Sequence, residues 1–464
     1  MSEKSSSAEY RKLPSVDELL RSERVHLLLN TYSRDFVVGA LRDALCDARA
    51  AIGRGEKAED VDVLAAYAAG LIEKRSRHSL RRAINGSGII LHTGLGRAVL
   101  SEQARQAIQN AAEGHCTLEI DTATGKRGSR QDHVSGLLTE LTGAESALVV
   151  NNNAAAVILA VNTLALAREA IISRGQLVEI GGSFRMPEII ERAGAKMIEV
   201  GTTNRTRIRD YEKAISDRTG LILRCHPSNY QISGFVEEAS LLELVELGSR
   251  TGIAVVDDLG SGALVDLSRY GLEREPTVQD SVRAGADLVT FSGDKLLGAS
   301  QAGILVGKKQ LIDACRSNPL ACALRVDKLT LAALEATLHV YREGDPGADI
   351  PVLSTLARPI LEIEQQAREL VAAVDCLGIG SLSAEVVPTT SETGGGSLPG
   401  QSIESRAIAL KSDRLSAEDL AKHFREFEPP IFGRIVRDVF LLDMRTISAK
   451  DVLDIVGCIK QLAH

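Results

Sequence analysis

The chain has 464 residues, of which 44% are hydrophobic and 25% charged, and its formal net charge is −8. This is the composition of an ordinary soluble globular protein with room for more than one domain, and the charge by itself does not indicate a nucleic-acid partner. The start lacks an apolar signal core, no later run can span a bilayer, and the seven cysteines are scattered, so we expect a cytoplasmic protein with reduced thiols, no membrane segment and no metal site.

The first predicted elements are helices. Residues 14–82 place apolar and charged side chains at helical spacing, and Ser15 followed by Glu18 has the pattern of a capping box. A loop is expected around the segment IGRGEKAED. Residues 1–82 therefore predict a small N-terminal helical domain.

From Ile84 onward the pattern changes to short β-branched runs that alternate with helical stretches. This alternation predicts an α/β domain over residues 83–328, with a mostly parallel sheet covered by helices on both faces. The text after Lys328 is helical and then mixed, with a glycine-rich turn in SETGGGSLPG and a late strand in DVFLLDMR. Residues 329–464 are therefore predicted to form a smaller α+β domain.

Three segments concentrate basic residues, and they are EKRSRHSLRR, GKRGSR and NRTRIR. Such clusters can form local phosphate-binding patches on an acidic protein. Solvated helix faces and loops are the ordinary alternative for each of them.

Polar residues follow three of the predicted strands, where ligands gather in a parallel sheet. The segment ALVVNNNAAAV places Asn153 at a strand end, before a helix whose N–H groups at Ala154 and Ala155 are open to a phosphate. A second strand ends in Asp257 and Asp258, and a third runs into Ser292-Gly293-Asp294-Lys295. Helix capping and loop roles are the alternatives for the asparagine and the aspartates.

Together these residues match the needs of pyridoxal 5′-phosphate. Its phosphate needs a helix N-terminus and a hydroxyl, its ring nitrogen needs a carboxylate, and its aldehyde needs a lysine for the Schiff base. Burial of Lys295 among apolar and small residues would lower its pKa and make it a nucleophile and a base.

The sequence also resembles the bacterial selenocysteine synthases, the L-seryl-tRNA(Sec) selenium transferases, over nearly its whole length. The segments that carry the resemblance are LHTGLGRA, ALVVNNNAAAV, SRGQLVEIGGSFRMPEI, EVGTTNRT, HPSNYQISGF, DLGSGALVDLSRYGL, FSGDKLLG and ALRVDKLTLAALEATL. The resemblance implies a fold-type-I pyridoxal-phosphate transferase. It also implies conversion of seryl-tRNA(Sec) to selenocysteyl-tRNA(Sec), by loss of the serine hydroxyl to an aminoacrylyl intermediate and addition of selenium from selenophosphate.

The family pattern also implies roles for single residues. The acid that faces the ring nitrogen lies in DLGSG, which selects Asp258 over Asp257. Phe184 is then expected near the cofactor ring and Asn229 near its O3′ oxygen. The residues expected to bind the selenophosphate anion are Arg97, Arg325 and His226, with His92 as a further candidate.

Three positions depart from the family pattern. The family usually has Asn at Gly94, Gly-Pro at Ala299-Ser300, and Arg at Cys322. The change at Cys322 removes a positive charge from the expected anion site or its neighbourhood.

The resemblance further implies that the helical segment binds tRNA, with Arg21, Arg24 and the Lys74–Arg82 cluster in contact with phosphates. It also implies a homo-oligomer built from dimers, with a decamer as one size.

Two alternative functions remain open from the residues. One is a small-molecule pyridoxal-phosphate β-lyase, favoured by Gly94 and Cys322 and disfavoured by the helical segment. The other is a non-catalytic tRNA-binding relative, disfavoured by the intact lysine and aspartate.

Overall fold

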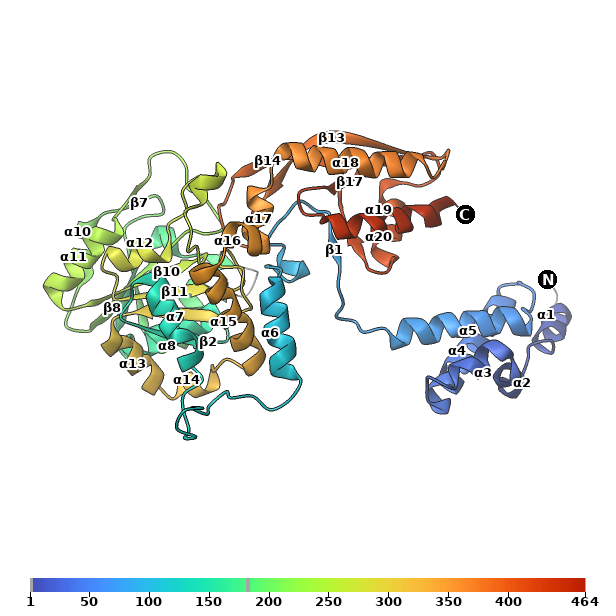
Figure 1. Ribbon diagram of the computed structural model, residues 1–464, viewed down its shortest axis with the longest axis horizontal. Helices are drawn as coiled ribbons and strands as arrows, with labels where there is room; N and C mark the ends of the chain where they lie inside the picture. The colour runs from blue at the N-terminus through green and yellow to red at the C-terminus, as the bar shows by residue number, and fades with distance from the viewer. Residues whose placement is uncertain (1–2, 181–183, 464) are drawn as a thin grey trace. The chain divides into compact units, whose positions relative to one another are not determined.

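The computed structural model describes residues 3–180 and 184–463 (Figure 1). The chain separates into two compact units, Met1–Arg82 and Ala83–His464. No helix within the described ranges combines the length and the apolar character that a membrane span requires.

The first unit is helical, as the sequence predicts. Its core is formed by apolar side chains such as Leu41 and Ile72, which are fully buried. The predicted capping box is confirmed, because Glu18 N donates to Ser15 Oγ (3.2 Å) and Ser15 N donates to the Glu18 carboxylate (2.7 Å). The helices are α1 (Glu3–Tyr10), α2 (Val16–Arg21), α3 (Glu23–Leu28), α4 (Arg34–Gly53) and α5 (Val61–Ser76).

The second unit is built on a seven-stranded sheet with the strand order β2-β12-β11-β10-β8-β3-β6. Only β12 runs antiparallel to its neighbours in this sheet, so the prediction of a mostly parallel sheet is confirmed. The strands are β2 (Ser146–Val150), β3 (Glu169–Ser173), β6 (Lys196–Val200), β8 (Thr219–Cys225), β10 (Ala254–Gly260), β11 (Leu288–Ser292) and β12 (Gly303–Gly307).

Helices cover both faces of this sheet (Figure 1). Successive strand residues point to opposite faces, so Leu288 packs in one core and Val289 in the other. One face carries α8 (Asn153–Ala165), α9 (Met186–Arg192) and α13 (Lys309–Ser317). The other face carries α7 (Asp132–Thr142), α10 (Ile208–Ala214), α11 (Leu241–Thr251), α12 (Val278–Arg283) and α15 (Lys328–Glu343).

The C-terminal part adds an antiparallel sheet with the order β13-β14-β17-β16. Its strands are β13 (Leu382–Glu392), β14 (Ser402–Ser412), β16 (Arg434–Val436) and β17 (Val439–Asp443). The helices that pack on it are α18 (Ile360–Asp375), α19 (Ala417–Glu426) and α20 (Val452–Lys460). The predicted glycine-rich turn joins β13 to β14.

Segments from the two ends of this unit cross between its two parts. Strand β1 (Ile84–Asn85) pairs with β15 (Ile431–Phe432), and Ile84 is buried in the C-terminal core. Helix α15 packs against α7 and against α6 (Glu102–Ala112) on the large sheet. The predicted division at residue 328 therefore stays a prediction. The remaining short elements are α14 (Leu320–Ala323), α16 (Pro346–Asp349), α17 (Pro351–Ala357), β4 (Glu179–Ile180), β5 (Phe184–Arg185), β7 (Arg205–Thr206) and β9 (Glu237–Glu238).

Candidate active site

Asp258 and Lys295 lie at the carboxyl edge of the large sheet, on neighbouring segments. Asp258 sits in β10 opposite Thr290 of β11, and Lys295 follows the end of β11. Asp258 is 7% exposed and Lys295 is 4% exposed. Asp258 Oδ1 accepts two hydrogen bonds, from Asn153 Nδ2 (2.8 Å) and from Thr290 Oγ1 (2.9 Å).

The environment drives both groups toward their neutral forms. Burial raises the pKa of the Asp258 carboxyl, and the hydrogen bonds from Asn153 and Thr290 oppose this only in part. Burial lowers the pKa of Lys295; the negative charge of Asp258 opposes that shift, while the positive charge of Arg97 adds to it. A buried amine with a lowered pKa is suited to nucleophilic attack and to proton transfer.

The neighbouring aspartate has different partners. Asp257 is fully buried, pairs with Arg224 (2.8 Å) and accepts from Ser281 Oγ (2.6 Å). Because consecutive residues of a strand face opposite sides of the sheet, Asp257 points away from Lys295. Its partners are those of a structural ion pair.

The N-terminus of α8 adjoins Asp258 and offers donors to an anion. Asn152 is the N-cap, and its Oδ1 already accepts from Ala155 N at 2.9 Å. This leaves the N–H groups of Asn153 and Ala154 for an anion. Ser292, which is 5% exposed, lies on the same face of β11 as Thr290 because the two residues are two positions apart.

The two predicted anion-binding arginines lie at this same edge of the sheet. Arg97 is in an ion pair with Asp294 (2.8 Å), the residue before Lys295. Arg325 forms a bridge with Val150 at the end of β2, and its side chain has no ion pair within residues 3–180 and 184–463. Cys322 is exposed on α14, three residues before Arg325.

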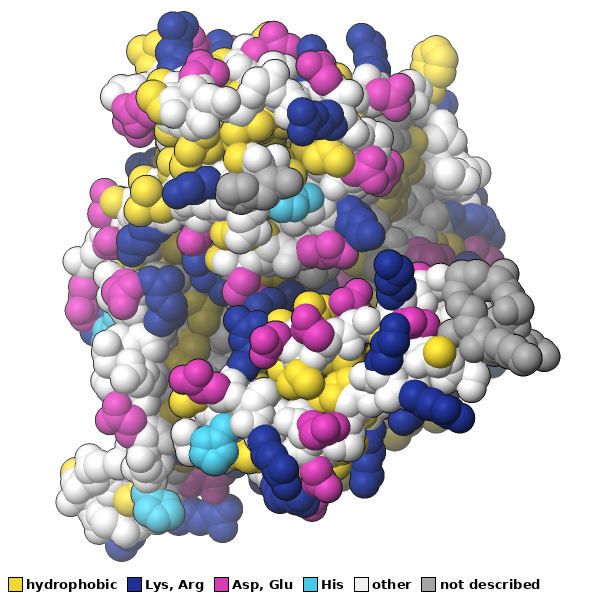
Figure 2. All heavy atoms as spheres, turned by 90° about the vertical axis from the view of Figure 1, so that its right-hand side faces the viewer, with side chains coloured by type: hydrophobic (Ala, Val, Ile, Leu, Met, Phe, Trp, Pro, Cys, Tyr) yellow, Lys and Arg dark blue, Asp and Glu magenta, His cyan; other side chains and the backbone are white. Residues whose placement is uncertain are grey.

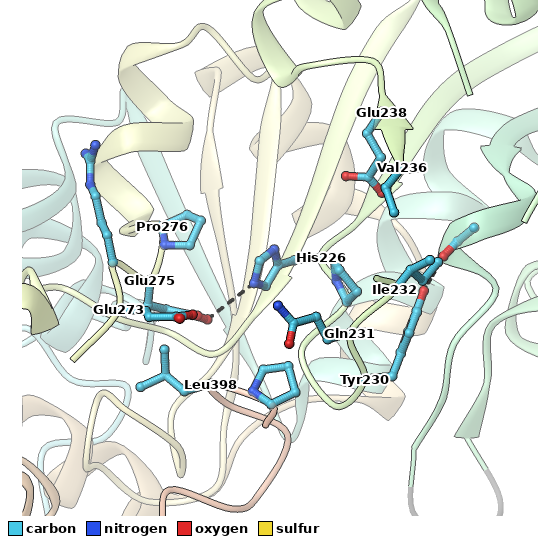
Figure 3. Close-up of a pocket in the computed structure, with 14 residues that line it drawn as sticks. His226, Tyr230, Gln231, Ile232, Val236, Glu238, Glu273, Glu275, Pro276 and Leu398 are labelled. Carbon is cyan, nitrogen blue, oxygen red and sulfur yellow. Dashed lines mark hydrogen bonds and ion pairs between the residues drawn. The ribbon is translucent and has the colours of Figure 1, made fainter. Parts of the chain in front are cut away.

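His226 lines a cavity of about 260 Å³ that Figure 3 shows in close-up. Its backbone N–H donates to the Asp258 carbonyl (2.9 Å), and its ring Nε2 points at Glu275 Oε1, 3.5 Å away (Figure 3). Asn229 Nδ2 donates to the Glu179 carbonyl at 2.8 Å. Phe184 is half-buried in β5 and packs against the core beside α8.

Sequence reasoning missed three contributors to this site. Thr290 was overlooked, although its alternation with Ser292 was a readable signal. Glu275 and the turn between β13 and β14 gave no such signal, because only folding brings them here. A Cβ placed on Gly396 of that turn would lie 3.5 Å from Lys295 Nζ.

Several arginines of the basic clusters are ion-paired. Arg127 and Arg130 both pair with Glu119, and Arg207 pairs with Glu237. On the face seen in Figure 2, basic and acidic side chains are interspersed. In the described part of the chain, no three His, Cys, Asp or Glu side chains are arranged to hold a metal ion.

The fold and the buried lysine define the class of fold-type-I pyridoxal-phosphate enzymes, as predicted. A solved structure with this fold is a D-glucosaminate-6-phosphate ammonia-lyase, with a TM-score of 0.58 and 21% identity over 83% of this chain and 96% of that one.

Comparison of sequences gives a narrower assignment. The family model described as L-seryl-tRNA selenium transferase matches residues 83–448, and that of the selenocysteine synthase N-terminus matches residues 10–49. The L-seryl-tRNA(Sec) selenium transferase of Methylocella silvestris is 50% identical over 96% of both chains, and that of Carboxydothermus hydrogenoformans is 47% identical over 95% of both. The chain belongs to the L-seryl-tRNA selenium transferase family.

Proposed function

We propose that this protein converts seryl-tRNA(Sec) to selenocysteyl-tRNA(Sec), with pyridoxal 5′-phosphate attached to Lys295 and selenophosphate as the selenium donor. The names of its relatives support the overall reaction. The observation that carries the proposal is the burial of the Lys295 amine beside the buried Asp258 carboxyl.

The residues present fit the cofactor. The backbone N–H groups of Asn153 and Ala154 at the start of α8 can donate to a phosphate, while Asn153 Nδ2 is already bonded to Asp258 Oδ1. In this proposal Lys295 holds the aldehyde carbon and Asp258 the ring nitrogen. The phosphate is assigned to the N–H groups of Asn153 and Ala154 and to Ser292, with Phe184 near the ring and Asn229 near O3′. Ala155 is a predicted phosphate residue too, but its N–H is already bonded to Asn152 Oδ1. When bound, the cofactor supplies an electron sink for loss of the α-proton and of the β-hydroxyl.

Lys295 then serves as the proton-transfer group. Its lowered pKa keeps a larger fraction of the amine neutral near pH 7 than in an exposed lysine, so Nζ can take up the α-proton of the seryl group. Asp258 has the complementary part. Burial disfavours the ionised form of the Asp258 carboxyl, and a cationic neighbour such as a protonated ring nitrogen would stabilise that form. The hydrogen bonds from Asn153 and Thr290 hold the carboxyl in one orientation.

Selenophosphate is assigned to Arg97, Arg325 and His226. The guanidinium fork suits the oxygens of this anion. Arg97 shares its charge with Asp294, so in this proposal Arg325 provides the less compensated charge. Cys322 supplies no charge where the family usually has arginine.

Residues 1–82 are proposed to bind the tRNA, through Arg21, Arg24 and the Lys74–Arg82 cluster. Part of this charge is already paired, since Arg75 lies 2.6 Å from Asp43 and Arg77 lies 3.1 Å from Glu73. Phosphate contact would therefore require exchange of partners, and binding should weaken steeply with salt. The assembled form is proposed to be a homo-oligomer built from dimers, with a decamer as one size.

The test is conversion of seryl-tRNA(Sec) by the purified full chain, with and without selenophosphate. The expected result is selenocysteyl-tRNA(Sec) only when the donor is present, together with a cofactor absorbance band that Lys295→Ala abolishes. Lys411→Ala, which changes an exposed lysine on β14, is the matched control and should keep the band and the product. Conversion of free amino acids but not of seryl-tRNA(Sec) would show that the protein is a β-lyase. Absence of the absorbance band in the wild type would show that it is a non-catalytic tRNA-binding protein.

A further inference from the structure

The turn between β13 and β14, residues 393–401, reaches the active-site lysine. We call it the glycine loop. A Cβ placed on Gly396 would lie 3.5 Å from Lys295 Nζ and 3.4 Å from Ser228 Oγ. The loop therefore forms a wall of the active site that presents backbone, with no side chain, to the reacting amine.

The position of the glycine loop is determined by packing on residues 89–91. Leu91 N donates to the Thr393 carbonyl (2.8 Å), and Ile90 N donates to the Glu392 carbonyl (3.0 Å). Gly394, Gly395 and Gly396 have φ values of 69°, 61° and 74°, which glycine adopts without strain. A Cβ on Gly394 would approach the Ile89 side chain to 2.3 Å. The three glycines thus have defined backbone conformations, and the loop packs against residues 89–91.

The glycine loop encloses a cavity of about 240 Å³ with unsatisfied polar groups. Ser397 is 3% exposed, and its Oγ has no hydrogen-bond partner among the described residues. Gln401 Oε1 is likewise buried without a partner in that part of the chain. Buried polar atoms left unpaired destabilise a fold, so such atoms on residues that line a cavity indicate a ligand. The cavity is lined in addition by Ser228, Asn229, Glu392, Gly396 and Leu398.

The charge of the cavity restricts that ligand. Its described lining contains one ionisable side chain, Glu392, and no lysine or arginine. A free carboxylate or a phosphate would find no cation here to offset the loss of its hydration. An ester carbonyl and ribose hydroxyls carry no charge, and hydroxyl and amide groups suit them.

We propose that the glycine loop binds the ester group and the terminal ribose of the aminoacylated substrate, with Ser397 and Gln401 as the groups that hydrogen-bond the ribose hydroxyls. This inference rests on the proposed function and adds the subsite that separates an esterified serine from a free amino acid. A substrate whose carboxyl group is esterified needs no arginine at this position. This subsite, which has no lysine or arginine in its described lining, therefore selects against free serine, whose carboxylate would enter unpaired beside Glu392.

The experiment measures binding of two probes to the full-length protein loaded with its cofactor. The first is 3′-(L-serylamido)-3′-deoxyadenosine, a stable analogue of the acylated end, and the second is L-serinamide, which lacks the nucleoside. Ser397→Ala is expected to weaken the first probe about tenfold, the loss of one hydrogen bond, and to leave the second unchanged. Gln401→Leu should give the same pattern.

The matched control is Ser383→Ala, the same change at an exposed position on β13. It should bind both probes as the wild type does. Thermal unfolding and the cofactor absorbance show whether each variant is folded, and Gln401→Leu provides the test if Ser397→Ala is not. Equal weakening of both probes, or no weakening of either, would overturn the inference.

Conversion of seryl-tRNA(Sec) by the wild type separates the two proposals. A wild type that makes selenocysteyl-tRNA(Sec), together with variants that bind the adenosine probe normally, refutes the glycine-loop inference alone. A wild type without conversion refutes the proposed function and the inference with it.

Discussion

Two buried carboxylates in the second unit have opposite surroundings. Asp443 of β17 is fully buried, and both of its oxygens are bonded: Ser405 Oγ donates at 2.6 Å, Ser391 Oγ at 3.1 Å and Arg434 Nη2 at 3.2 Å. Asp258 is buried almost as deeply, but both of its hydrogen bonds end on Oδ1, and its nearest cationic group is a lysine whose own pKa is lowered.

The difference indicates the role of each cluster. A buried carboxylate whose oxygens are all paired, with an arginine partner, is satisfied by the protein itself and needs no ligand. Asp443 also contacts the chain near residue 88, since a Cβ on Gly88 would lie 2.3 Å from its Oδ2. Beside Asp258, by contrast, Asn153 donates through Nδ2 while its buried Oδ1 has no partner in the described chain. Incomplete pairing of this kind indicates a binding site.

The sharpest test of the comparison is Asp258→Asn. We expect kcat to fall about a thousandfold, or about 4 kcal/mol, because a neutral amide does not keep the cofactor ring nitrogen positive. The cofactor-free protein should be at least as stable at pH 7 as the wild type. A carboxyl with a raised pKa in the folded state lowers stability once the pH exceeds its unfolded pKa, and asparagine removes that cost. Single-turnover kinetics and urea unfolding measure the two effects. A large loss of stability with intact kcat would show that Asp258 is a structural carboxylate and not a catalytic one.

Asp443→Asn should have the opposite profile. Loss of the charge leaves Arg434 without its buried partner, which should cost about 3 kcal/mol of unfolding free energy. The midpoint of urea unfolding should fall, while kcat of the remaining folded protein stays close to normal. Asp413→Asn, at an exposed position after β14, is the control and should change neither quantity. An unchanged midpoint for Asp443→Asn would show that the charge of Asp443 does not contribute to the stability of the fold.

Arg97→Gln tests whether the charge of Arg97 contributes to the lowered pKa of Lys295. The charge of Arg97 helps to lower the pKa of Lys295, so its removal should raise that pKa and reduce the neutral amine at a given pH. Capture of pyridoxal phosphate by the cofactor-free protein should slow several-fold near neutral pH and recover at alkaline pH. Stopped-flow absorbance across this range measures the rate, with the exposed Arg105→Gln as control. A rate profile displaced toward acid would contradict the expected sign.

Cys322→Arg should have the smallest effect. It restores the charge that the family usually has, at an exposed position three residues from Arg325. Exposed charge pairs are weak, so the KM for selenophosphate should fall only about two- to threefold, and less at high salt. Steady-state kinetics at two ionic strengths measure this, with Cys376→Arg, at another exposed cysteine, as control. An increase in KM would place the selenophosphate site elsewhere.

Local patterns in the sequence predicted many elements correctly. The capping box at Ser15, the helix from Lys328 and the strands that end at Val150 and Ser292 all follow from residues close together in the chain. Periodicity and capping depend on neighbours within a few residues, which is why a single sequence reveals them.

Contacts between distant segments were not predictable in this way. The register that sets Thr290 against Asp258, the pairing of Arg97 with Asp294, and the approach of Gly396 to Lys295 each join residues remote in the chain. The N–H group of Ala155, which the sequence predicts to be open to a phosphate, is instead bonded to Asn152 Oδ1. Several neighbouring asparagines satisfy the same local rule, and only the packed helix selects one.

The sequence alone determined the order of elements and the chemistry at each strand end, because hydrophobic period, turn residues and a lone lysine after an apolar run are local properties. The tertiary structure decided which of those groups remain without partners. Whether a buried oxygen is satisfied depends on every segment that folds against it, and the glycine loop arrives beside Lys295 from a strand pair 100 residues further along the chain.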